Sequence, residues 1–236
     1  MTEKNSTPTP VSQVIRERMQ GDGKRYWAGD NISDYVNETE RQQLVDEATA
    51  KFESLLDTML IDRQTDPNSK ETGRRLAKMY INELFDGRFS PKPEATAFPN
   101  DDADARFNGV LVTQTELKSV CSHHWQPVTL MCYIGIIPNT KMIGLSKYSR
   151  LAQHVARRGT LQEELTNEIA NEITHATGSK DIGVVCVGSH GCCENRGIMA
   201  NNSATYTAVL RGQFHAQGVK EEFFQAIERV KTFKCN

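Results

Sequence analysis

Two short motifs rich in cysteine and histidine are the part of this sequence best suited to chemistry. CSHH occupies residues 121–124, and HGCC occupies residues 190–193 at the end of the apolar run IGVVCV. The C-x-x-H spacing of the first motif lets one turn of the chain present a thiolate and an imidazole to the same tetrahedral cation. The two motifs together therefore predict a zinc site.

The expected ligands are one cysteine and one histidine of the first motif and one cysteine of the second. If residues 190–193 continue a strand, side chains alternate between its faces, so His190 and Cys192 share one face while Cys193 points to the other. Cys192 is then the natural third ligand. The predicted metal ligands are Cys121, His124 and Cys192.

Three protein ligands would leave the fourth zinc position to water, which is typical of a catalytic site, whereas a structural site has four protein ligands. Cys193 or His123 could supply a fourth ligand, so the structural alternative stays open on spacing alone. In the catalytic interpretation, His123 and His190 lie where proton donors and acceptors are needed beside a metal-activated water.

A second group of residues suggests a site for a polyanion. Its members are cations three residues apart on expected helices, Arg75 with Lys78 and Lys147 with Arg150, together with Arg196 beside the second motif. Cations at this spacing share a helix face and repel one another unless an anion or solvent screens them. Each cation taken singly is more typical of a solvated surface, but together they suggest a phosphate site near the metal.

The composition excludes several other classes of protein. The 236 residues include 28 basic and 30 acidic side chains, a net charge of −2, which gives no concentrated basic face for nucleic acid. No apolar run reaches the roughly 18 to 20 residues of a membrane span, and the N-terminus lacks the apolar core of a signal peptide. A cytoplasmic protein is expected, whose six cysteines are thiols rather than disulfides.

Hydrophobic periodicity predicts helices first and a sheet afterwards. Apolar residues at helical spacing predict one helix over 38–61 and a second that ends at Gly87. The proline-rich stretch 88–109 is expected to be a long surface connection. Runs rich in Val, Ile, Leu and Thr predict strands over 110–120, 127–138, 142–146, 181–192 and 203–214, with two helices separated at Gly159 and a final helix over 219–230.

These elements predict an α+β fold. The expected organisation is a flexible N-terminal arm over 1–32, a helical region over 33–90 and a catalytic region over 91–236, within a single domain overall. Cys132 and Cys186 fall in apolar strands and are expected in the core. The histidines outside the two motifs, expected at the surface, are His154, His175 and His215.

Five stretches, in order, resemble the GTP cyclohydrolase I family, zinc enzymes that open the imidazole ring of GTP to make dihydroneopterin triphosphate. The stretches are ETGRRLAKMYINELFDG, CSHH, IGLSKYSRLAQ, TLQEELTNEIA and SHGCCENRG, which together span roughly residues 70–210. The resemblance implies a T-fold (tunnelling fold), an antiparallel sheet backed by helices, preceded here by the N-terminal helices. It also implies assembly, typically as a homodecamer of two pentamers, with active sites at subunit interfaces.

The resemblance further implies a role for each matching residue. Zinc would be held by the three ligands above and would activate water to attack C8 of GTP, after which formate leaves and a rearrangement closes the pterin ring. The implied catalytic residues are His123 and His190 as acid/base groups and Ser146 in opening the ribose. The implied substrate-binding residues are Arg75, Lys78, Lys147, Arg150 and Arg196 for the triphosphate and Gln162 and Glu163 for the guanine.

A few positions depart from the usual pattern of that family. Ser122 stands where the family usually has an acid, Cys193 where it commonly has an apolar residue, and Gly73 where a proline is common. Glu194 and Asn195 stand where basic or small residues are usual. None of these changes removes a ligand or an acid/base histidine, so an active enzyme is expected.

Two alternatives come from other classes of protein. A T-fold protein that keeps zinc and nucleotide, with altered substrate or no turnover, is suggested by Ser122 and Glu194. A structural zinc module for nucleic acid would need four protein ligands and a basic face, which the balanced charge disfavours. The same ring opening begins the folate, reduced-pterin cofactor and 7-deazaguanine pathways.

Overall fold

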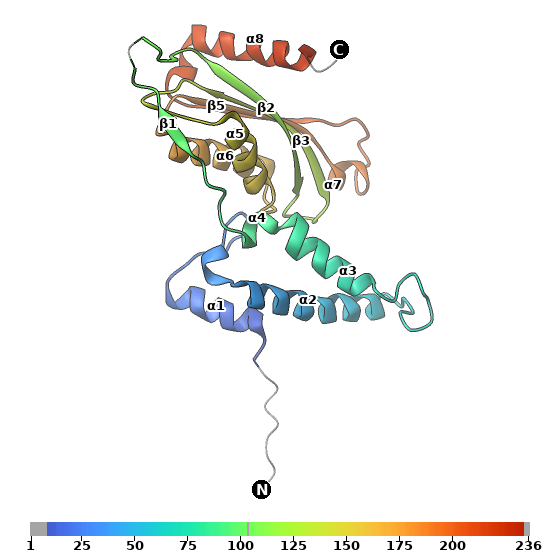
Figure 1. Cartoon of the computed structure of the whole chain (residues 1–236). Helices are drawn as coiled ribbons and strands as arrows, with labels where there is room; N and C mark the ends of the chain where they lie inside the picture. The colour runs from blue at the N-terminus through green and yellow to red at the C-terminus, as the bar shows by residue number, and fades with distance from the viewer. Residues whose placement is uncertain (1–8, 103, 234–236) are drawn as a thin grey trace. The chain divides into compact units, whose positions relative to one another are not determined.

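The computed structural model describes residues 9–102 and 104–233, and the chain divides into two units at Pro91. The first unit is helical, and the second is built around an antiparallel sheet (Figure 1). The predicted α+β class is confirmed. Of the predicted N-terminal arm, residues 1–8 lie outside the described residues.

Helices of the first unit pack through two small apolar clusters. Ile15 and Met19 of α1 pack against Ile32 and Val36, so the predicted arm contains a packed helix. The elements are α1 (Val11–Gly21), the 3-10 turn η1 (Ser33–Tyr35), α2 (Glu38–Thr58), α3 (Thr72–Lys78), the π-helical turn η2 (Met79–Leu84) and α4 (Asp86–Phe89).

The boundaries of α2 and α3 have local causes. Asn37 caps α2: its side chain accepts a hydrogen bond from the Glu40 N–H, while the Glu40 carboxylate accepts one from the Asn37 N–H. The helix predicted over 38–61 ends three residues early. The second predicted helix is interrupted by η2, where Arg41 donates a hydrogen bond to the Ile81 carbonyl (3.0 Å).

The second unit contains a four-stranded antiparallel sheet in the order β2-β3-β5-β6, which carries helices on both faces (Figure 1). Its strands are β2 (Leu111–Val120), β3 (Pro127–Ile136), β5 (Ile182–His190) and β6 (Thr205–Leu210). The remaining elements are β1 (Ala97–Pro99), β4 (Lys141–Ile143), α5 (Leu145–Ala156), α6 (Gln162–Thr177), α7 (Gly191–Glu194), the 3-10 turn η3 (Gly212–His215) and α8 (Gln217–Phe233).

Side-chain alternation divides the core of this unit into two layers. On one face, residues such as Leu130, Cys132 and Ile134 pack with α5 and α6. On the opposite face, Tyr133 and Val185 pack with Phe223 of α8 and with neighbouring apolar side chains. The sheet therefore has a large layer on the α5–α6 side and a smaller one beneath α8.

Most predicted strands are confirmed, but those predicted over 142–146 and 203–214 are shorter, as β4 and β6, and the chain is already helical at Leu145 and Gly212. Two further corrections concern the stretch before β2 and the end of β5. The stretch 88–109 is not only a connection, because β1 within it pairs antiparallel with β4. The strand predicted over 181–192 ends at His190, and the chain then turns into the short helix α7. The break between α5 and α6 is confirmed at Gly159, whose φ of 73° lies in the left-handed region that favours glycine.

The thiols are placed largely as expected, but one histidine is not. The five cysteines in the described part of the chain are free, and Cys132 lies directly opposite Cys186 in the core. The surface prediction for His154 is wrong. The residue is only 7% exposed, and its Nδ1 lies 3.3 Å from Nη2 of Arg158, a buried cation paired with Glu168 and Glu172.

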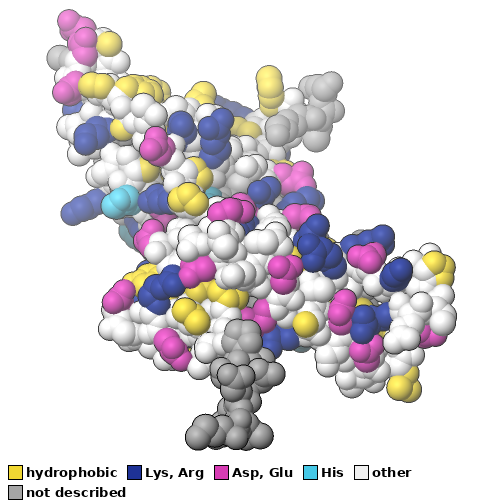
Figure 2. All heavy atoms as spheres, turned by 60° about the horizontal axis from the view of Figure 1, so that its bottom comes forward, with side chains coloured by type: hydrophobic (Ala, Val, Ile, Leu, Met, Phe, Trp, Pro, Cys, Tyr) yellow, Lys and Arg dark blue, Asp and Glu magenta, His cyan; other side chains and the backbone are white. Residues whose placement is uncertain are grey.

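The surface agrees with the balanced charge of the sequence. On the face shown in Figure 2, acidic and basic side chains are interspersed. Among the described residues, none of the helices combines the length and the apolar character that crossing a membrane would require.

Substitution of Gly188 tests how closely β5 and β3 approach each other. A Cβ at this position would meet the Leu130 side chain and the Thr129 carbonyl oxygen. We expect Gly188→Ala to lower the free energy of unfolding by about 1 to 3 kcal/mol, because the strands must separate to admit the methyl group. Urea denaturation monitored by circular dichroism measures this change.

Gly218→Ala is the matched control, since a Cβ at Gly218 meets no atom within 4 Å. Its denaturation midpoint should equal or exceed that of the parent. An unchanged midpoint for Gly188→Ala would contradict the close packing described for these strands.

Candidate metal centre

Cys121 and His124 lie in the tight loop that joins β2 to β3. The loop is closed by two backbone hydrogen bonds, from the Cys121 N–H to the Gln126 carbonyl (3.0 Å) and from the Trp125 N–H to the Cys121 carbonyl (2.9 Å). Trp125 has a φ of 52°, in the left-handed region. The C-x-x-H motif therefore occupies one turn, which the closed loop holds in place.

Cys192 approaches this loop from α7. Val128 pairs with His190, so the end of β5 lies beside the start of β3. A Cβ at Gly191 would lie 3.0 Å from the Pro127 carbonyl oxygen, so glycine permits the close approach of α7 to β3. The prediction that strand alternation presents Cys192 is wrong, because the chain is helical over Gly191–Glu194.

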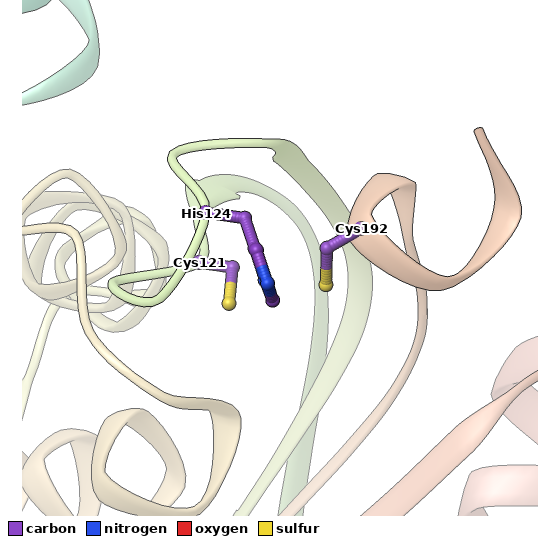
Figure 3. Close-up of side chains that lie close together, drawn as sticks. All are labelled: Cys121, His124 and Cys192. Atoms are coloured by element: carbon purple, nitrogen blue, oxygen red, sulfur yellow. The ribbon is translucent and has the colours of Figure 1, made fainter. Parts of the chain in front are cut away.

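The structure brings the three predicted ligands together. The sulfurs of Cys121 and Cys192 and a ring nitrogen of His124 all lie within 4.8 Å of one another (Figure 3). Zinc binds sulfur at about 2.3 Å and imidazole nitrogen at about 2.0 to 2.1 Å, so tetrahedral ligand atoms lie roughly 3.3 to 3.8 Å apart. A small closure of this group would satisfy that geometry.

The donor set is suited to a borderline-soft metal and includes one exposed side chain. Thiolates and imidazole favour metals such as zinc over calcium or magnesium. Cys121 is buried and Cys192 half-buried, whereas His124 is exposed. In the described part of the chain, no fourth histidine, cysteine, aspartate or glutamate belongs to the group.

The protonation of Cys192 depends on its surroundings. Burial, and after it the neighbouring thiols of Cys121 and Cys193, together raise the pKa of this thiol to about 11. A thiol in this environment stays protonated at neutral pH until a cation takes the place of its proton. Binding of a divalent cation at this thiol would therefore release its proton.

His190 is held by the first residue of α6. Its Nε2 lies 2.7 Å from Oε1 of Gln162, a side chain that is only 3% exposed. The Gln162 amide nitrogen also lies within hydrogen-bonding distance of the Cys186 carbonyl (3.2 Å), the Thr205 carbonyl (3.1 Å) and the Thr207 hydroxyl (3.1 Å). Both polar atoms of Gln162 are therefore engaged within the protein.

The other candidate residues of this unit lie at the surface, at the beginnings of helices or in the loops between elements. His123 is exposed beside His124, with their ring planes nearly perpendicular at 87°. Ser146 and Arg150 are exposed and Lys147 is half-buried near the start of α5, Glu163 is exposed in the first turn of α6, and Arg196 is exposed after α7.

Several of these charged side chains have no partner of opposite charge among residues 9–102 and 104–233. Lys147, Arg150 and Arg196 enter none of the ion pairs found among the described residues, and the same is true of Glu163. In the first unit, Arg75 and Lys78 are exposed on α3 and are likewise unpaired within the part of the chain that is described.

Two threonines beside Gln162 belong to the same hydrogen-bond group, although no sequence motif marks them. Thr166 donates a hydrogen bond to the Gln162 carbonyl (2.7 Å), and its hydroxyl lies 2.7 Å from that of Thr207 on β6. A threonine four residues after Gln162 could have suggested the bond within the helix. Nothing in a single sequence, however, pairs either residue with Thr207.

Comparison with known proteins identifies the family. The model of the family described as GTP cyclohydrolase I matches residues 48–228. The chain belongs to the GTP cyclohydrolase I family. The α+β T-fold expected from the resemblance is thereby confirmed, as is membership of a family of hydrolytic enzymes.

Individual relatives cover most of the chain. GTP cyclohydrolase 1 of Aeromonas salmonicida is 34% identical over 183 residues, which cover 77% of this chain and 83% of the relative. The protein of the same name from Pseudoalteromonas translucida is 36% identical over 169 residues, 69% of this chain and 90% of the relative. That from Campylobacter jejuni subsp. jejuni is 36% identical over 190 residues, 78% of this chain and 98% of the relative.

The ligand group predicts different effects for the two adjacent cysteines. Cys192→Ala should weaken binding of a divalent metal by more than about 100-fold, because it removes one of three ligands. Cys193→Ala should keep one metal ion per chain, because Cys193 lies outside the group. Metal content of the purified variants, measured by mass spectrometry of the element, distinguishes the two cases.

An equal loss of metal in both variants would show that Cys193 is a fourth ligand. The centre would then be structural rather than open.

Proposed function

We propose that this protein is a zinc-dependent GTP cyclohydrolase that opens the imidazole ring of GTP at C8, releases formate and yields 7,8-dihydroneopterin triphosphate. The observation that carries the proposal is the group of Cys121, His124 and Cys192 in a chain of the GTP cyclohydrolase I family. Three protein ligands with one open side are the arrangement expected of a catalytic zinc rather than a structural one. Bound zinc would supply a Lewis acid that makes water nucleophilic near neutral pH.

Acid/base chemistry is assigned to the two histidines that flank the ligands. Hydration at C8 and cleavage of the carbon–nitrogen bonds to C8 require proton transfers to and from the purine ring nitrogens. His190 lies two residues before Cys192 and is anchored by Gln162, and His123 directly precedes His124 with its ring exposed. A histidine has the ordinary pKa best matched to proton transfer at neutral pH.

Binding of the triphosphate is assigned to the basic side chains that form no ion pair within the described part of the chain. Lys147 and Arg150, in the first two turns of α5, and Arg196 after α7 would bind the triphosphate, together with Arg75 and Lys78 of α3. The positive end of the α5 dipole favours an anion at the same place. Ser146, in the same first turn, is the residue proposed to assist opening of the ribose.

Recognition of guanine is assigned chiefly to Glu163. Its carboxylate is exposed in the first turn of α6 and takes part in no hydrogen bond or ion pair within the described residues. A carboxylate can accept two hydrogen bonds from the N–H groups along one edge of guanine. Glu163 is free to do so, unlike Gln162, whose amide is already engaged.

Membership of the family supports a proposal for the assembly, the location and the division of the chain. The proposed assembly is a homodecamer of two pentamers with active sites at subunit interfaces, in the cytoplasm. The proposed division of the chain is an N-terminal arm, a helical region and a catalytic region that begins near residue 91. The product class is a reduced pterin of the kind that begins tetrahydrofolate synthesis.

The proposal predicts formate release from GTP by the zinc-loaded protein. His190→Ala should lower kcat by about 100- to 10,000-fold, because it removes a proton donor and acceptor. His215→Ala is the control, since His215 is exposed in η3 and should leave the rate unchanged. Formate is measured by a coupled dehydrogenase assay, and the pterin product by its fluorescence after oxidation.

A parent protein that binds zinc and GTP but releases no formate would overturn the proposal. The alternative of a nucleotide-binding member without turnover would then be favoured.

A further inference from the structure

We infer that Gln162 is a positioning residue, which holds His190 in the tautomer protonated at Nε2 and leaves Nδ1 as the ring nitrogen with a free lone pair. The inference rests on the proposed function for the acid/base role of His190. It goes beyond that function, because it states which ring nitrogen is available and which residues decide it. It also removes Gln162 from the group of guanine-binding side chains.

The orientation of the Gln162 amide follows from its neighbours. One end of the amide lies 3.2 Å from the Cys186 carbonyl oxygen and 3.1 Å from the Thr205 carbonyl oxygen. Carbonyl oxygens only accept hydrogen bonds, so the end that faces them must be the NH₂ group. A flipped amide would place three oxygens against one another with no hydrogen between them.

The protonation of His190 follows in turn. With the NH₂ group turned to the carbonyls, Oε1 is the atom 2.7 Å from His190 Nε2. An amide oxygen has no hydrogen to give, so His190 Nε2 must donate the hydrogen of this bond. In the neutral ring Nδ1 then carries no hydrogen, and it has no hydrogen-bond partner among the described residues.

Two threonines fix the amide in this orientation. The Thr166 hydroxyl donates to the Gln162 backbone carbonyl, so the 2.7 Å contact between the two hydroxyls is a bond donated by Thr207. Thr207 is then free to accept a hydrogen bond from the Gln162 amide (3.1 Å). Every hydroxyl hydrogen in this group has one acceptor, and a network in which each group is satisfied in this way favours a single arrangement.

The burial of Gln162 disfavours direct contact between its side chain and the substrate. The side chain is 3% exposed, and its bonds tie the start of α6 to β5 through Cys186 and to β6 through Thr205 and Thr207. Contact with guanine would require several of these bonds to break. Substitution of Gln162 should therefore lower kcat through His190 and leave the KM for GTP near the parent value.

The test is a direct observation of the His190 tautomer, made without substrate. The probe is magic-angle-spinning ¹⁵N NMR of protein labelled at the histidine nitrogens, at about pH 8, above the ordinary pKa of histidine. The His190 signals are identified by their loss in His190→Ala. The parent should show His190 protonated at Nε2 alone.

Gln162→Met keeps nearly the same length and volume but can neither donate nor accept these bonds. It should show both tautomers of His190, and kcat for formate release should fall about 10- to 100-fold with the KM for GTP unchanged. Gln153→Met is the matched control, because Gln153 is exposed on α5. It should keep the parent spectrum and rate.

Thr207→Val provides a second variant if Gln162→Met does not fold. It keeps the side-chain shape and removes one acceptor of the Gln162 amide, so it should produce a smaller change of the same kind. An unchanged His190 tautomer in the folded variants, or a raised KM with unchanged kcat, would overturn the inference. A parent that shows the expected tautomer but releases no formate would overturn the proposed function and leave the positioning role of Gln162 standing.

Discussion

The register of β3 against its two neighbours is the constraint on which the whole site depends. The pairing of Val120 with Pro127 sets the length of the loop that carries Cys121, and the pairing of Val128 with His190 places the start of α7 beside it. Side chains alternate along a strand, so a slip of one residue between β3 and β5 would turn His190 to the opposite face. The ligand group and the bond to Gln162 would be lost together.

A polar network inside an apolar core makes this register more specific. Buried amides and hydroxyls are costly without partners, and Gln162, Thr166 and Thr207 satisfy one another and the adjacent carbonyls. Any other alignment of α6 on the sheet would leave several of these groups unpaired. The same bonds that orient His190 therefore also favour a single packing of the sheet and its helices.

Local signals account for what the sequence predicts well. Apolar spacing and the glycine at 159 predict α2, α5, α6 and most strands, and the C-x-x-H spacing predicts that Cys121 and His124 lie close together on one turn. The three-residue strand β1 was missed, because its pairing with β4 is a tertiary contact with no periodic signal. The burial of His154 and the network around Gln162 likewise depend on residues distant in the sequence.

The turn from strand to helix at Gly191 changes how the second motif must be understood. In a strand, Cys193 would point away from Cys192 by half a turn, whereas in a helix successive side chains differ by about 100°. Cys193 consequently remains close enough to raise the pKa of the Cys192 thiol, yet it lies outside the ligand group. Cys192 thus joins the group with Cys121 and His124 from a helix rather than from the strand that the alternation argument assumed. A neighbouring thiol in this position disfavours the bare thiolate of Cys192, and a bound cation relieves that penalty.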